Sequence, residues 1–195
     1  TFRAKNPAIL TVEDVLPYLD CNNRGYNPSG GEVSGTFVIA LSDLQLGKTD
    51  ERGGTPDTLA RVATIFDGIE QELKSSPAFA EIVLYDVGDI IEGFTNTTQQ
   101  QQTNDLSLTD QLRTAQAVIL NAFERFAHLA PIFTYVSVPS NHCQVRSSAG
   151  NKNRSNSPDD DYGVMLLDNI QQAVERPGAY TNAQFLRPTR SDDVV

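Results

Sequence analysis

The sequence has few cysteines and no long apolar run, and each shortage excludes a class of protein. Its 195 residues contain two cysteines, Cys21 and Cys143, which lie far apart and form no Cys-x-x-Cys pair. A thiolate zinc site and a thioredoxin-like motif are therefore excluded, and a reducing cytoplasm is the simplest compartment for the chain. No segment approaches the roughly 20 apolar residues that cross a bilayer, so we expect no membrane partner.

Basic residues are also scarce. The chain has 15 Lys and Arg against 25 Asp and Glu, a formal net charge of −10. A general basic surface for nucleic acid is therefore absent, although bound cations could still attract a phosphate group. Neither a Gly-x-Gly-x-x-Gly nor a Gly-x₄-Gly-Lys-[Ser/Thr] element follows any predicted strand, which argues against a nucleotide-binding domain.

The hydrophobic pattern predicts one α/β domain. Hydrophobic residues make up 39% of the chain, enough for a sizeable core. The predicted strands are 36–42, 81–87 and 132–138, and the predicted helices are 55–76, 109–128 and 160–175. This alternation predicts a largely parallel sheet flanked by helices. We assign residues 1–35 to an N-terminal extension and linker and 36–195 to the domain, with the last twenty residues left ambiguous.

Polar residues follow each predicted strand. Asp43 and Gln45 follow the first strand, Asp89 follows the second, and Asn141 and His142 follow the third. The carboxyl ends of parallel strands meet at one edge of a sheet, so we expect these residues to converge. Asp43 and Gln45 point the same way if their segment is extended. Oxygen and imidazole groups are ligands for divalent metals.

Each of these residues has an ordinary explanation when taken singly. Ser42-Asp43 after a strand is typical of a turn or cap, and so are Gly88-Asp89 and Asn141. Their occurrence in order at three successive strand ends favours a metal site.

Three segments carry a resemblance to a known family. Asp43-Leu44-Gln45, Gly88-Asp89-Ile90-Ile91-Glu92 and Ser140-Asn141-His142-Cys143 resemble the motifs of the calcineurin-like metallophosphoesterases. Those motifs are Asp-x-His, Gly-Asp-x-x-[Asp/Glu] and Gly-Asn-His-[Asp/Glu], each after a strand. The resemblance covers about residues 36–145. Within the superfamily the chain looks most like phage and bacterial metallophosphoesterases and nucleases of the double-strand-break repair type.

The resemblance implies a centre with two divalent metal ions. Asp43 and Gln45 would bind the first metal, Asp89 would bridge both, and Asn141 would bind the second. Gln45 stands where the family has histidine, and an amide oxygen suits a harder ion, so we expect Mn²⁺, with Zn²⁺, Fe or Mg²⁺ as alternatives. Two such cations clamp the attacking and leaving oxygens of a phosphate ester during an in-line displacement.

The resemblance also implies an acid pair and a substrate. His142 would protonate the leaving oxygen, and Glu92 would orient its imidazole. Arg146, Lys152 and Arg154 form a basic loop that would contact phosphate or a nucleic-acid backbone, unless it is only a solvated loop. We expect a phosphoesterase that hydrolyses phosphate mono- or diesters, and a DNA exo- or endonuclease is one form of it.

Several departures from the family pattern support a second hypothesis. Gln45, Ser140 and Cys143 replace the usual His, Gly and acid, and no histidine follows His142, whereas the family ends in Gly-His-x-His. We expect a chain truncated before that element, with an incomplete C-terminal part of an αββα sandwich. The alternative is a catalytically inactive binding or scaffold module with this fold.

Three further features are weaker candidates. His128 lies at the end of a predicted helix, where an imidazole caps carbonyl groups. Cys143 beside His142 is disfavoured as a thiol nucleophile, because adjacent residues on an extended segment point apart. The segment Gln99–Gln102 is either a lid or a solvated loop, and the solvated loop is favoured.

Overall fold

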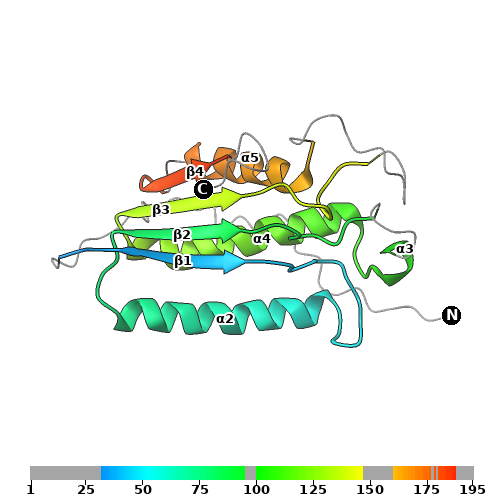
Figure 1. Ribbon diagram of the computed structural model, residues 1–195, viewed down its shortest axis with the longest axis horizontal. Helices are drawn as coiled ribbons and strands as arrows, with labels where there is room; N and C mark the ends of the chain where they lie inside the picture. The colour runs from blue at the N-terminus through cyan, green and yellow to red at the C-terminus, as the bar shows by residue number, and fades with distance from the viewer. Residues whose placement is uncertain (1–31, 95–99, 147–159, 177, 179, 188–195) are drawn as a thin grey trace.

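The computed structural model describes residues 32–94, 100–146, 160–176, 178 and 180–187. Lys152 and Arg154 of the predicted basic loop lie outside these ranges. The strands are β1 (Thr36–Leu41), β2 (Glu81–Asp86), β3 (Ile132–Ser137) and β4 (Ala183–Leu186); the helices are α2 (Thr55–Ser75), α3 (Gln100–Thr103), α4 (Leu108–Phe126), the 3₁₀ helix η2 (Ala127–Leu129) and α5 (Tyr162–Glu175). Figure 1 shows their order.

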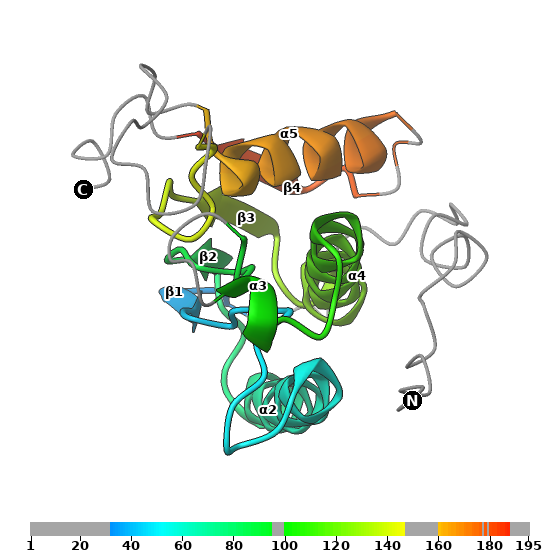
Figure 2. The same ribbon diagram turned by 90° about the vertical axis from the view of Figure 1, so that its right-hand side faces the viewer.

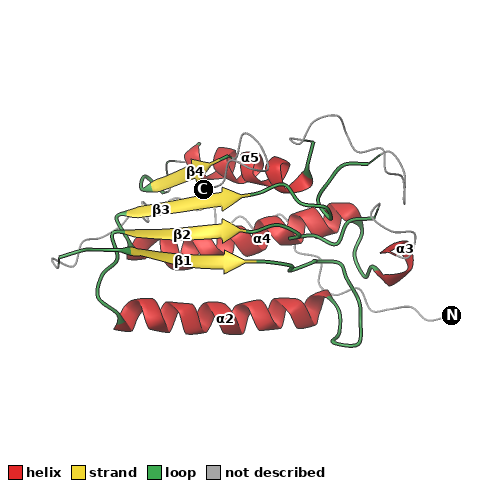
Figure 3. Ribbon diagram, in the orientation of Figure 1, coloured by secondary structure: helices red, strands yellow, loops and turns green. Residues whose placement is uncertain are grey.

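The four strands form one parallel sheet in the order β1-β2-β3-β4 (Figure 3). This confirms the prediction of an α/β fold with a parallel sheet. β4 lies in the region that the sequence left ambiguous. In the register, Leu41 pairs with Asp86, which pairs with Ser137, so the first three strands end at the same level. The segments that follow these strands therefore leave the sheet side by side.

Two long helices cover one face of the sheet. Figure 2 shows α2 and α4 on the same side of β1 and β2. Phe66 of α2 packs edge-on against Phe126 of α4, and Phe123 of α4 packs against Phe133 of β3 and stacks on Phe185 of β4. α5 joins the same core through its buried apolar positions. The core therefore fixes the sheet that carries the strand-end segments.

The opposite face of β1 and β2 is uncovered by any described helix. Val38 is 56% exposed and Ala40 is exposed, whereas their neighbours Ile39 and Leu41 are buried against the helices. Val38 pairs with Val83. The sheet thus presents apolar side chains on both faces, although the described helices cover only one face of these two strands.

The helix starts follow local capping chemistry. Thr55 begins α2, as predicted, and the Asp57 carboxylate accepts a hydrogen bond from the Gly54 N–H at 3.0 Å. Ser107 caps α4 by accepting from the Asp110 N–H, so the helix begins at Leu108, one residue before the predicted start. Among the described residues, no helix is long and apolar enough to cross a membrane.

Candidate metal centre and its histidine

The segments after β1 and β2 are joined by backbone hydrogen bonds. The Asp43 N–H donates to the Gly88 carbonyl at 3.2 Å, and the Gln45 N–H donates to the Asp89 carbonyl at 2.9 Å. Three of the predicted ligands, Asp43, Gln45 and Asp89, therefore lie on neighbouring stretches of backbone just beyond the sheet.

The same three residues share an unusual backbone conformation. Among the described non-glycine residues, positive φ angles occur at Asp43 (53°), Gln45 (42°) and Asp89 (56°). The prediction that Asp43 and Gln45 sit on an extended segment is therefore wrong. The left-handed conformation costs an L-residue about 1–2 kcal/mol, and aspartate tolerates it better than glutamine does. Strain of this kind clusters at functional sites.

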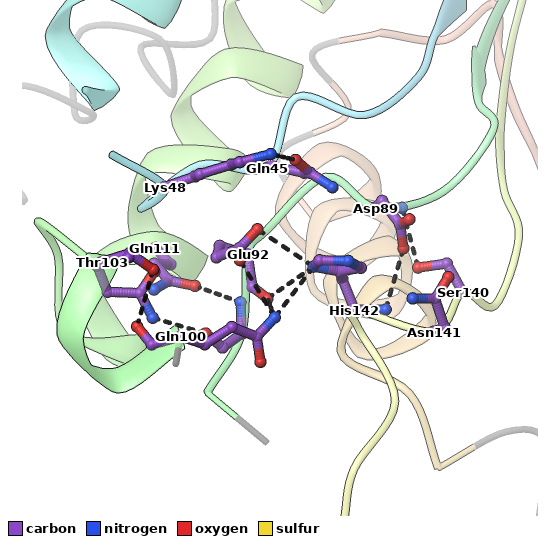
Figure 4. Close-up of polar contacts among 12 residues, drawn as sticks. Gln45, Lys48, Asp89, Glu92, Gln100, Thr103, Gln111, Ser140, Asn141 and His142 are labelled. Atoms are coloured by element: carbon purple, nitrogen blue, oxygen red, sulfur yellow. Dashed lines mark hydrogen bonds and ion pairs between the residues drawn. The ribbon is translucent and has the colours of Figure 1, made fainter. Parts of the chain in front are cut away.

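The segment after β3 joins the other two through Asp89. The Asp89 Oδ1 accepts a hydrogen bond from the His142 N–H at 3.0 Å, and the Asp89 N–H donates to the Ser140 Oγ at 2.9 Å (Figure 4). Asn141 lies between these two partners and is exposed. The structure thus brings all three strand ends together around Asp89.

Ser140 has a role that the sequence did not reveal. Its hydroxyl accepts the Asp89 N–H, and its own N–H donates to the Asp161 Oδ2 at 3.0 Å. Asp161 also caps α5 by accepting from the Gly163 N–H. Ser140 is therefore part of a hydrogen-bonded chain from α5 to Asp89. The available signal was a serine at the position where the resembled motif has glycine.

Gln45 is paired with a cation from its own segment. The Lys48 Nζ donates to the Gln45 Oε1 at 2.7 Å, and both side chains are half-buried (Figure 4). A carboxamide oxygen carries two lone pairs, so this contact leaves one free for a second partner. Lys48 also places a positive charge beside a cluster that is otherwise acidic.

His142 and Glu92 form the predicted pair. The His142 Nδ1 lies 2.9 Å from the Glu92 backbone carbonyl and 3.2 Å from the Glu92 Oε2. The neighbouring Glu92 carboxylate raises the pKa of His142, although burial opposes this. Because a carbonyl oxygen only accepts, Nδ1 carries the hydrogen. The Nε2 of His142 is therefore the nitrogen that can gain or lose a proton.

Gln100 is buried, in contrast to the solvated loop predicted for this segment. Gln100 is 4% exposed and begins the short helix α3. Its Nε2 donates to the Glu92 carbonyl at 3.0 Å and to the Glu92 Oε1 at 3.2 Å. Of its neighbours, Gln102 is exposed and Gln99 lies outside the described residues. The prediction of a solvated loop is therefore wrong for Gln100. Its burial was missed because no sequence motif marks a buried amide at this position.

The remaining candidates, Arg146, His128 and Cys143, lie in different surroundings. The Arg146 Nη2 lies 3.5 Å from the Asn141 carbonyl oxygen, which places this arginine beside the candidate site. His128 is exposed in η2, at the end of α4. Cys143 is 1% exposed, and burial raises the pKa of its thiol to about 12. A thiolate nucleophile at Cys143 is therefore disfavoured.

A buried carboxylate, Asp86, lies at the end of β2. The Ser137 Oγ donates to its Oδ2 at 2.8 Å, and the Gly88 N–H donates to its Oδ1 at 3.0 Å. Burial raises the pKa of Asp86 from 3.8 to about 6. Between these two values the folded protein holds a proton that the unfolded chain releases, so the stability of the fold decreases as pH rises through this window.

This predicts a pH-dependent effect of Asp86→Asn. The variant has no carboxylate to ionise, so its stability relative to wild type should rise by about 2.4 kcal/mol between pH 4 and pH 7. Urea denaturation at several pH values measures the difference, and Glu51→Gln, at an exposed carboxylate in the turn before α2, is the control. A difference between Asp86→Asn and wild type that is the same at both ends of the window would contradict the burial argument.

Gly93 allows His142 to approach the segment after β2. Gly93 has a φ of +70°, and a Cβ there would lie 2.5 Å from the His142 carbonyl oxygen. Gly178 has a φ of +63°, but a Cβ added to Gly178 would have nothing within 4 Å. Gly178→Ala should cost about 1 kcal/mol through backbone conformation alone. Gly93→Ala should cost about 3 kcal/mol, because a steric clash adds to it. Equal losses in chemical denaturation would show that the contact with His142 is unimportant.

The donor set fits a hard divalent cation. The carboxylates of Asp43 and Asp89 and the amide oxygen of Gln45 are all oxygen donors. Within the described ranges, no cluster of three or more His, Cys, Asp or Glu side chains could hold a metal ion. A metal here would therefore depend on the amide oxygens of Gln45 and Asn141 as well as on the two carboxylates.

Comparison with known proteins does not assign the chain to a class. No family model, no curated protein and no solved structure matches it. The proposed function therefore rests on the residues of the site.

Proposed function

We propose that the chain is a divalent-metal-dependent phosphoesterase. The observation that carries this proposal is the shared left-handed conformation of Asp43, Gln45 and Asp89, since these were the residues predicted as metal ligands from their motifs. A fold tolerates this strain where precise placement of side chains is useful. Asp43, Gln45, Asp89 and Asn141 would hold the metal ions, with Mn²⁺ as the expected ion.

The residues around the cluster divide the work of phosphate ester hydrolysis. Divalent cations bound there would stabilise the charge that develops on the phosphate oxygens. His142, with Nδ1 engaged by Glu92, can deliver a proton from Nε2 to the leaving oxygen. Lys48 and Arg146 add positive charge beside the site and favour an anionic substrate.

The uncovered sheet face supports the finer fold that we propose. An αββα sandwich requires a second sheet against the face of the first that its helices leave free. Val38, with 56% exposure, and the neighbouring Ala40 and Val83 are suited to that contact. We propose that the described sheet is one half of such a sandwich.

A hydrolysis assay tests the proposed activity. The chain is incubated with Mn²⁺ and either bis-p-nitrophenyl phosphate or linear DNA, with and without a chelator. We expect Mn²⁺-dependent release of p-nitrophenol that the chelator abolishes, and DNA degradation would identify a nuclease. A rate equal to that of the metal-containing buffer would contradict the proposal.

A catalytically inactive binding or scaffold module is the second candidate. It is favoured by the shortage of His, Cys, Asp and Glu ligands among the described residues. The two candidates differ in metal uptake. A purified chain that takes up no Mn²⁺, Zn²⁺ or Fe at excess metal would favour the scaffold.

A further inference from the structure

Gln100 is a buried amide that contacts both members of the His142–Glu92 pair. Its Nε2 lies 3.0 Å from the Glu92 carbonyl oxygen, 3.2 Å from the Glu92 Oε1 and 3.3 Å from the His142 Nδ1 (Figure 4). A carboxamide nitrogen carries two hydrogens, which suits the two oxygens of Glu92. The His142 Nδ1 donates to the same Glu92 carbonyl oxygen. The orientation of the imidazole therefore depends on Glu92 staying in place.

The two oxygens of the Glu92 carboxylate have different surroundings. Oε1 accepts from Gln100, whereas Oε2 is buried without a hydrogen bond from the described residues and lies 3.2 Å from the His142 Nδ1. Glu92 is 5% exposed, so water offers little compensation for a lost partner. The hydrogen bond from Gln100 to Oε1 restrains the carboxylate, and Oε2 lies beside the imidazole.

The short helix that carries Gln100 is anchored independently of this side chain. The Thr49 N–H donates to the Thr103 carbonyl at 2.8 Å, and the Asp105 N–H donates to the Gly47 carbonyl at 2.8 Å. The Asp105 carboxylate in turn accepts from the Thr55 N–H at the start of α2. A substitution at Gln100 should therefore leave α3 in place.

The same stretch of chain holds the turn after Glu92. The Asn104 Nδ2 donates to the Gly93 carbonyl at 2.7 Å, and the Gln111 Oε1 accepts from the Gly93 N–H at 2.9 Å. Gln111 is fully buried. The side-chain amides of Asn104 and Gln111 thus hold the backbone of Gly93. Of Gln100, Asn104 and Gln111, only Gln100 contacts the Glu92 side chain in the described interactions.

We propose that Gln100 is a positioning residue: it orients the Glu92 carboxylate so that His142 is held with its hydrogen on Nδ1. The consequence for catalysis rests on the proposed function, in which the Nε2 of His142 serves the leaving oxygen. The effect on the imidazole itself does not depend on any activity of the chain.

Two variants and a matched control test this role. Gln100→Glu keeps the shape but replaces the donor with a second carboxylate, and Gln100→Ala removes the side chain. Gln102→Glu makes the same charge change at an exposed position of α3. Thermal melts identify the variants that remain folded, and either Gln100 variant suffices for the measurements below.

Nitrogen NMR of the imidazoles provides a readout that needs no activity. The chain has two histidines, so the exposed His128 serves as an internal reference. At a pH where imidazole is neutral, wild type and Gln102→Glu should show His142 with hydrogen on Nδ1. The Gln100 variants should show a changed His142 pattern and an unchanged His128. A wild-type His142 with hydrogen on Nε2, or His142 signals that the Gln100 variants leave unaltered, would overturn the proposal.

The kinetic readout separates positioning from substrate binding. Loss of a residue that supports a catalytic group typically costs about 10–100-fold. We expect kcat of the Gln100 variants to fall at least about tenfold, with KM little changed and Gln102→Glu equal to wild type. If the wild type is active and the Gln100 variants keep its kcat, the proposed effect of Gln100 on catalysis is overturned. If the wild type is inactive, the NMR result still decides the positioning role, and the failure belongs to the proposed function.

Discussion

Asp89→Asn is expected to lower kcat/KM for phosphodiester hydrolysis by about a thousandfold, equivalent to about 4 kcal/mol of transition-state stabilisation. The substitution removes the negative charge of the carboxylate that we propose as the bridge between two cations. Asparagine keeps a side-chain oxygen that can accept the His142 N–H, and it tolerates the left-handed backbone found at Asp89. The fold should therefore survive while the metal-dependent activity is lost.

Steady-state kinetics with saturating Mn²⁺ measure this effect, and a denaturation curve establishes that the variant is folded. Asp67→Asn removes an exposed carboxylate on α2 and is the matched control. An Asp89→Asn protein with wild-type kcat/KM would show that the reaction does not use this carboxylate.

His142→Ala is the second substitution with a large expected effect. General acid catalysis by a positioned side chain typically contributes about 10²–10⁴-fold, so we expect kcat to fall by about that factor. The loss should be smaller for bis-p-nitrophenyl phosphate than for DNA, because p-nitrophenolate leaves readily without a proton. This difference between the two substrates distinguishes a missing acid from a general disruption of the site.

The second histidine of the chain provides the control. His128→Ala removes an exposed imidazole in η2 and should leave both rates unchanged. If His142→Ala lowered kcat equally for both substrates, His142 would act through substrate or metal placement and not as an acid.

The sequence predicted the arrangement of the first three strands because their hydrophobic pattern is clear. Strands were expected at 36–42, 81–87 and 132–138, and the structure has Thr36–Leu41, Glu81–Asp86 and Ile132–Ser137. β4 was missed because it is four residues long and follows a region without a clear period. Short strands of this kind depend on pairing with a neighbour, here β3, and not on local sequence preference.

The backbone of the candidate site could not be predicted from residue types. A left-handed conformation is expected at glycine or asparagine, and nothing about Gln45 indicates it. It arises from the backbone bonds that tie this segment to the one after β2, which are contacts between residues far apart in the sequence. The positions of Asp43, Gln45 and Asp89 therefore follow from the pairing of two loops.

The supporting residues were missed for a related reason. Gln100 lies in no motif, and the hydrogen bonds of its side chain to Glu92 cross a turn of the chain. Ser140 departs from its motif, and it acts through a hydrogen bond to Asp89, a residue far away in the chain. Glutamine in a polar stretch is usually solvated, which favoured the wrong prediction for Gln100. Buried amides of this kind become visible only when their hydrogen-bond partners are known.

In the function that we propose, the strand-end cluster binds a divalent metal through Asp89. A titration with Mn²⁺, followed by the electron paramagnetic resonance signal of the free ion, measures this directly for wild type, Asp89→Asn and Asp67→Asn. We predict that wild type and Asp67→Asn bind Mn²⁺ with equal affinity, and that Asp89→Asn binds at least about tenfold more weakly. Equal binding by wild type and Asp89→Asn, or no uptake by the wild type at excess metal, would contradict the claim.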